Sequence, residues 1–127
     1  MTESIPDVEM EPEPRIGIDS PSDGCRVVAV GGELDLHTVP QLRERLHAVL
    51  AEPGITHLVI DLSEATFLDS SALGVLVGAL KRVKEAGGQL DIVLPTSPLR
   101  RIFEITALDR VLVLHETRAE ALERAPT

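Results

Sequence analysis

The amino-acid sequence predicts a single α/β domain with a mixed, mostly parallel sheet of five strands and about four helices. Its 127 residues, 43% of them hydrophobic, suit one buried core. Short apolar runs rich in β-branched residues alternate with segments whose apolar residues recur at helical spacing. The predicted order is β-β-α-β-α-β-α-β-α. Its alternating part implies parallel strands with right-handed crossovers, and we expect helices to cover one side of the sheet.

The first two strands are predicted to form a hairpin over residues 15–32. The segment RIGID (15–19) alternates polar and apolar residues, and CRVVAVGGELD begins a second strand at Cys25. Between them lies PSDG (21–24), which is rich in turn-forming residues. The remaining strands are expected at 56–63, 89–94 and 111–114.

Start and stop residues delimit the first two helices. Thr38 is a good N-cap for the first helix, with Gln41 three residues later as in a capping box, and Pro53-Gly54 ends the helix. The second helix is predicted over 70–86 and is stopped by Gly87-Gly88.

The last two helices also begin with recognisable caps. Ser97 is the expected cap of the third helix, with Pro98 at its favoured first position. Thr117 with Glu120 resembles a capping box and opens a final helix that extends to about Arg124.

Composition excludes several function classes. With 21 acidic and 12 basic residues the net charge is −9, which argues against nucleic acid and anionic membranes as partners. Cys25 is the only cysteine, so no internal disulfide can form and a reducing compartment is expected. No signal peptide is recognisable, and no apolar run approaches the ~20 residues that cross a bilayer. We therefore expect a soluble, cytoplasmic protein, and nothing demands more than a monomer.

The N-terminal segment differs from the rest of the chain. Residues 1–14 interleave prolines with acidic residues and offer little apolar surface to bury, so we expect a disordered tail. The predicted domain then covers residues 15–124.

Three polar residues, Asp69, Ser70 and Ser71, stand where strand-like sequence gives way to a helix. Asp and Ser are preferred N-caps, so capping alone could explain them, but one cap needs one residue. The alternative is a phosphorylation site. A helix N-terminus carries partial positive charge and free N–H groups, so a phosphoserine there would leave the helix intact. It would add roughly 1.5 to 2 negative charges and repel a docked partner.

Several segments together resemble the anti-sigma factor antagonist family, whose fold is the STAS domain. The segment LDSSALGVLVGALKRVKEAGG (68–88) is similar to the family's Asp-Ser-Ser/Thr-Gly-Leu/Ile-Gly motif, and GGELDLHTVPQLRERL (31–46) to its Gly-Glu-Leu-Asp motif. The segments HLVIDLSEATFLDSSALG (57–74) and LPTSPLRRIFEITALDRVLVLHETRAEAL (94–122) resemble its central and C-terminal parts. The likeness covers about residues 15–124.

This resemblance implies a partner switch. In the family, the unphosphorylated antagonist binds an anti-sigma factor, itself a GHKL-type serine kinase, and so frees the sigma factor. Phosphorylation of the first Ser after the Asp abolishes binding, and a phosphatase reverses it. Carried over by position, the phosphoacceptor is Ser70, and Asp35, Asp69, Ser71 and Ala72 belong to the contact surface.

Two of these positions carry a structural alternative. Ala72 replaces the family's common glycine, and as a better helix former it should stiffen the loop without removing the acceptor. Asp35 could cap the helix that begins near Thr38 or contact the partner. Since Thr38 is the better cap, we expect the Asp35 side chain to be less engaged in capping and freer to contact a partner.

Other functions find less support in the sequence. A Ser70 nucleophile would need a histidine base, but Gly-x-Ser-x-Gly is absent around Ser70. The four histidines show no metal-ligand spacing, and the glycine pairs lack nucleotide-binding fingerprints. We therefore expect no enzyme, no metal and no cofactor. A non-switching STAS scaffold, or a subunit of a larger signalling or lipid-transport assembly, remains the alternative.

Overall fold

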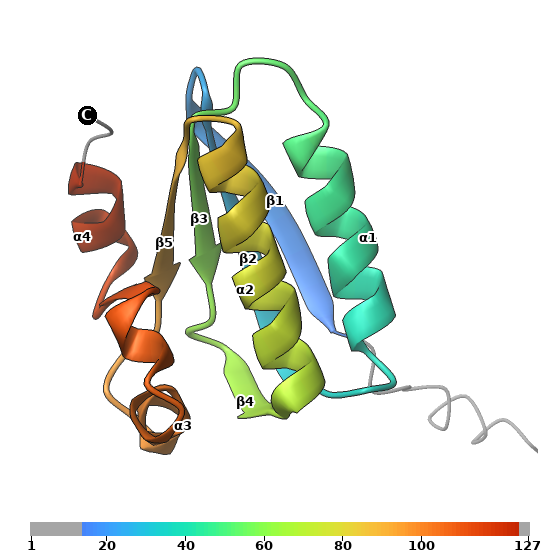
Figure 1. Ribbon diagram of the computed structural model, residues 1–127, viewed down its shortest axis with the longest axis vertical. Coiled ribbons are helices and arrows are strands. Elements are labelled where there is room, and N and C mark those ends of the chain that lie inside the picture. The colour runs from blue at the N-terminus through green and yellow to red at the C-terminus, as the bar shows by residue number, and fades with distance from the viewer. Residues whose placement is uncertain (1–13, 125–127) are drawn as a thin grey trace, which may run out of the picture.

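The computed structural model describes residues 14–124 as a twisted sheet with helices on both faces (Figure 1). The strands of the main path lie in the order β1-β2-β3-β5-β6, and β4 pairs with β2 off this path. Of the strands described, β1 alone runs antiparallel to its neighbour. The strands are β1 (Arg15–Ser22), β2 (Cys25–Leu34), β3 (His57–Asp61), β4 (Ala65–Leu68), β5 (Gln89–Val93) and β6 (Val113–His115).

The helices are α1 (Val39–Leu50), α2 (Ser70–Glu85), α3 (Pro98–Ile105) and α4 (Arg118–Glu123), with a 3₁₀ turn η2 (Leu108–Arg110). Alternate strand residues such as Val28, Ile60 and Ile92 pack in one core cluster with the apolar faces of α1 and α2. On the other face, Val59 packs with Ala121 of α4. The fold class predicted from the sequence is confirmed. The prediction placed helices on one side of the sheet, whereas α4 covers part of the second face.

The expectation of five strands was wrong, because β4 adds a sixth. β2 continues to Leu34, and β4 runs parallel to this last part, with Glu33 beside Phe67 and Leu34 beside Leu68. β4 has only four residues, which is too short for an alternating pattern to identify it in the sequence. It becomes evident only in the structure, where it pairs with the part of β2 that extends beyond β3.

The region after α3 also differs from its prediction. The helical pattern extends through residue 108, but α3 ends at Ile105. Ala107 adopts a left-handed backbone conformation with φ of 62°, which breaks the helix and starts η2. The last strand consequently begins at Val113, two residues later than predicted.

A buried carboxylate ties α4 to the sheet. Asp91 in β5 has no exposed surface, and it lies 2.8 Å from Nε2 of both His57 and His115. Gln89 Nε2 donates to it at 2.7 Å, and the guanidinium of Arg124, just after α4, donates at 3.2 Å. Sequence reasoning did not identify this network, because its members come from four separate segments.

Three further expectations concern the N-terminal tail, membrane-spanning segments and the cysteine. The predicted tail, residues 1–14, lies almost wholly outside the described residues, so its disorder stays a prediction. Within residues 14–124, no helix has both the length and the apolar character that crossing a membrane requires. Cys25 is buried, and burial raises the pKa of its thiol.

Candidate functional site

The predicted site residues meet at one end of the domain. β2 and β4 are parallel and end side by side, and the Asp69 N–H donates to the carbonyl oxygen of Leu34 at 3.1 Å. The loop between β2 and α1 therefore lies against the start of α2. Figure 1 shows β4 and the first turns of α1 and α2 at this same end. The sheet thus brings Asp35 close to Asp69 and Ser70, although 34 or more residues separate them in sequence.

Asp69 is the N-cap of α2. Its Oδ1 accepts hydrogen bonds from the backbone N–H groups of Ser71 at 2.9 Å and Ala72 at 3.1 Å, and from Ser71 Oγ at 2.5 Å. The hydrogen bond from the Ser71 hydroxyl is the largest influence that holds the pKa of Asp69 below its ordinary value. Asp69 is consequently ionised at neutral pH and serves as a structural cap.

The same carboxylate also joins the two loops of the site. Asp69 Oδ2 accepts the backbone N–H of Leu36 at 3.1 Å, in the loop between β2 and α1. Asp69 therefore sets the position of this loop relative to the helix start. Sequence reasoning placed Asp69 at the site but gave no sign of this bond.

The two serines have different environments. Ser71 is half-buried and its hydroxyl donates to Asp69. Ser70 is exposed as the first residue of α2, and within residues 14–124 its hydroxyl has no hydrogen-bond partner. The cap is thus supplied by Asp69, the Ser71 hydroxyl supports it, and Ser70 is left exposed.

The cap of α1 differs from the prediction. Thr38 occupies the N-cap position, but its hydroxyl donates to the Glu33 carbonyl oxygen at 2.7 Å and makes no cap bond to the helix. Asp35 accepts instead: its Oδ1 receives the N–H groups of His37 at 2.9 Å and Thr38 at 3.1 Å. The expectations of a Thr38 side-chain cap and of a freer Asp35 were therefore wrong. Thr38 is buried, so its hydroxyl turns to the nearest strand carbonyl.

Ala72 contributes no exposed surface. Its side chain is fully buried in the main core cluster, on the side of α2 that faces the sheet. We therefore remove Ala72 from the surface that a partner could touch, which leaves Asp35, Asp69, Ser70 and Ser71.

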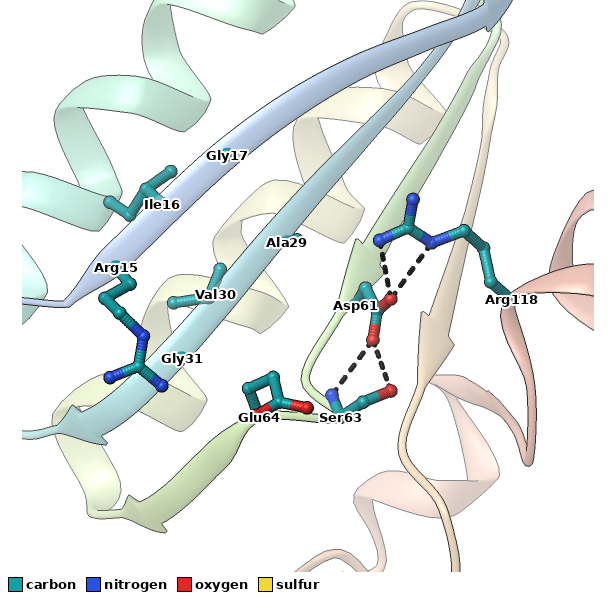
Figure 2. Close-up of a pocket in the computed structure, with 10 residues that line it drawn as sticks. All are labelled: Arg15, Ile16, Gly17, Ala29, Val30, Gly31, Asp61, Ser63, Glu64 and Arg118. Atoms are coloured by element: carbon teal, nitrogen blue, oxygen red, sulfur yellow. Dashed lines mark hydrogen bonds and ion pairs between the residues drawn. The ribbon is translucent and has the colours of Figure 1, made fainter.

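A hollow of about 470 Å³ lies elsewhere, on the opposite face of the sheet beside α4 (Figure 2). There Arg118 donates to Asp61 Oδ2 at 2.9 and 3.0 Å, and Ser63 donates to Asp61 Oδ1. Burial opposes ionisation of Asp61, but these hydrogen bonds outweigh it and lower the pKa of the carboxyl. None of the predicted site residues lines this hollow. The ion pair between Arg118 and Asp61 joins α4 to β3.

The described residues contain no constellation for metal chemistry. No group of three or more His, Cys, Asp or Glu side chains within residues 14–124 could hold a metal ion. The two histidines beside Asp91, His57 in β3 and His115 in β6, both have Nε2 engaged by this carboxylate.

Comparison with known proteins relates this geometry to named relatives. Residues 20–121 match the family described as the STAS domain. An anti-sigma-B factor antagonist from Listeria monocytogenes is 36% identical over 93 residues, which are 73% of this chain and 81% of the relative.

Solved structures give the same result. The crystal structure of an anti-sigma factor antagonist from Mycobacterium paratuberculosis aligns with a TM-score of 0.80 and 32% identity, covering 89% of this chain and 94% of that one. The Bacillus cell fate determinant SpoIIAA in its phosphorylated form aligns with a TM-score of 0.68 and 23% identity, covering 87% and 98% of the two chains. The second likeness concerns the fold alone.

Proposed function

Because this chain belongs to the STAS-domain family of anti-sigma factor antagonists, we propose that it is a partner switch controlled by phosphorylation of Ser70. In the unphosphorylated form it binds an anti-sigma factor that is a GHKL-type serine kinase, and this binding frees the sigma factor. Phosphorylation of Ser70 prevents binding, and a phosphatase restores the docking surface. The chain itself catalyses no reaction and acts in the cytoplasm.

The exposed hydroxyl of Ser70 at the start of α2, which has no hydrogen-bond partner among residues 14–124, carries the proposal. A kinase active site can reach this oxygen without unfolding the helix, since Asp69 supplies the cap. Ser71 is a poorer acceptor, because phosphorylation of its hydroxyl would break the bond to Asp69 and place two negative groups in contact.

Electrostatics supports the proposed effect of phosphate. A phosphate on Ser70 adds roughly 1.5 to 2 negative charges at pH 7 beside the ionised Asp69 and near Asp35. The N-terminal dipole of α2 tolerates this charge, so the fold should persist. A partner that docks on the unmodified surface would instead meet repulsion and a bulky group.

The deciding experiment maps the phosphate. The purified chain is incubated with ATP and the GHKL-type serine kinase encoded nearest to its gene, and the modified residue is identified by mass spectrometry. We expect one phosphate on Ser70 in the wild type and in Ser71→Ala, and none in Ser70→Ala. Phosphate confined to Ser71 or to the N-terminal segment would contradict the assignment.

A further inference from the structure

Two large apolar side chains are exposed at the end of the domain that carries Ser70. Leu36 is 71% exposed and Phe67 is 47% exposed, whereas the other aromatic residue, Phe103, is fully buried. We propose that Leu36 and Phe67 are the apolar anchors on which the anti-sigma factor kinase docks. This inference rests on the proposed function and adds the residues that supply its binding energy.

The backbone fixes both residues close to Asp69. The Leu36 N–H donates to Asp69 Oδ2 at 3.1 Å, so this residue is held against the helix cap. Phe67 lies in β4, two residues before Asp69, and pairs with Glu33 of β2. The next pair along the two strands, Leu34 and Leu68, is buried in the core. Because side chains alternate along a strand, Phe67 and Glu33 point outward.

Burial alone gives a weak reason for an apolar residue at either position. Leu36 at 71% exposure and Phe67 at 47% each leave a large part of the side chain in solvent, so each contributes less to the core than a buried residue of the same size. Exposed aromatic and aliphatic residues that gather beside a functional residue instead suggest an interface, where a few such side chains carry most of the binding energy.

The position of Ser70 determines the occupant. A kinase that receives the Ser70 hydroxyl must cover the residues around it, which include Leu36 and Phe67. A second copy of this chain on the same surface would block that access. Two side chains also supply only a fraction of the about 800 Å² per partner that a specific interface buries. They therefore form the centre of a patch that also includes the surface around Ser70.

Charge around the anchors specifies the partner further. Three exposed or half-exposed acids adjoin the apolar pair: Glu33 pairs with Phe67, Asp35 precedes Leu36, and Asp69 bonds to Leu36. The matching kinase surface should have an apolar centre and a basic rim. Loss of an anchor should then weaken binding at every salt concentration, whereas loss of Glu33 should matter mainly at low salt.

The test compares Leu36→Ala and Phe67→Ala with a matched control, Ile18→Ala. Ile18 is also an exposed apolar residue, at 36%, but it pairs with Val28, far along β2 from Leu34. Binding to the GHKL-type kinase encoded nearest to the gene is measured by titration calorimetry, and thermal unfolding of each variant is recorded. We expect the dissociation constant to rise at least tenfold for each anchor variant and less than twofold for the control, with Tm values close to wild type.

Different outcomes separate this inference from the proposed function. If the wild type binds and is phosphorylated on Ser70, but both anchor variants bind within twofold of it, the anchors alone are overturned. If the wild type neither binds the kinase nor accepts phosphate, the proposed function is wrong, and the anchor proposal, which rests on it, is wrong as well. If sedimentation shows a wild-type dimer that Leu36→Ala dissociates, the patch serves a second copy and the proposal is wrong. If Phe67→Ala is unstable, the affinity of Leu36→Ala alone tests the proposal, because Leu36 lies in an exposed loop.

Discussion

Asp69 and Asp91 lie in different parts of the domain, and each carboxylate takes part in four hydrogen bonds. The partners of Asp69 are three backbone N–H groups and the hydroxyl of Ser71, at an exposed helix start. The partners of Asp91 are four side chains, and Asp91 itself has no exposed surface. Asp69 orders a surface and leaves the neighbouring Ser70 free. Asp91 holds structural elements together and leaves no group available to a partner.

This contrast shows how a switch can act without disturbing the fold. The end of the domain that carries Ser70 is held by backbone donors, which persist whatever side chain occupies position 70. The network of Asp91 depends wholly on side chains and lies on the other face of the sheet. We therefore expect changes at the Ser70 end to alter binding, and changes in the Asp91 network to alter stability.

The largest effect is expected from Asp91→Ala. It leaves His57, His115 and Gln89 without their shared acceptor, and each buried donor left unsatisfied typically costs about 1–3 kcal/mol. Urea denaturation should show this decrease in the free energy of unfolding. Asp91→Asn retains the shape and one acceptor, so it should be destabilised less. A free energy for Asp91→Ala within about 1 kcal/mol of wild type would refute the structural importance of the network.

Ser70→Asp should weaken kinase binding without a matching loss of stability. A fixed negative charge beside Asp69 imitates part of the phosphate, and we expect at least a tenfold rise in the dissociation constant, or about 1.4 kcal/mol. Ser70→Ala is the control: it should bind as tightly as wild type and resist phosphorylation. Tight binding by Ser70→Asp would count against the electrostatic mechanism.

The lowered pKa of Asp69 predicts a pH dependence of stability. Because the folded state favours the ionised form, Asp69 stabilises the protein above its unfolded pKa of about 4, and this contribution is lost as pH falls through the lower folded pKa. Wild type should therefore exceed Asp69→Asn in Tm at neutral pH, and the difference should shrink below about pH 4. A difference that stays constant down to pH 2 would show that ionisation of Asp69 is not the cause.

The smallest effect is expected from Ser71→Ala. It removes one of the four hydrogen bonds to Asp69 and leaves the three backbone donors. We expect a smaller decrease in Tm than for Asp69→Asn, and kinase binding close to that of wild type. If Ser71→Ala abolished binding while the protein stayed folded, Ser71 would be a contact residue and the assignment of separate tasks to the two serines would be wrong.

Local patterns made much of this domain predictable. Helix starts depend on residues close in sequence, so Asp69, Ser97 and Thr117 could be recognised as caps, and each accepts a backbone N–H of its helix. Alternating strands and helices gave the parallel sheet. The parallel sheet in turn explains why Asp35 and Asp69 meet, since the ends of parallel strands lie at one edge.

The features that were missed depend on distant contacts. β4 exists because β2 extends beyond β3, and Asp91 gains its partners only when four segments pack together. Thr38 keeps the N-cap position of α1 without a side-chain cap bond, because its buried hydroxyl donates to Glu33, and Asp35 instead accepts two N–H groups of the loop before α1. The exposure of Phe67 likewise follows from its orientation in β4, which no local pattern reveals.

The central claim is that phosphate on Ser70 prevents docking and leaves the domain folded. It is tested most directly by measuring the dissociation constant of the kinase complex for chain phosphorylated on Ser70 and for unmodified chain, with the Tm of both forms recorded in the same buffer. The account predicts tight binding by the unmodified chain, at least tenfold weaker binding by the phosphorylated chain, and closely similar Tm values. Equal affinities, or weaker binding that accompanies unfolding of the phosphorylated chain, would contradict it.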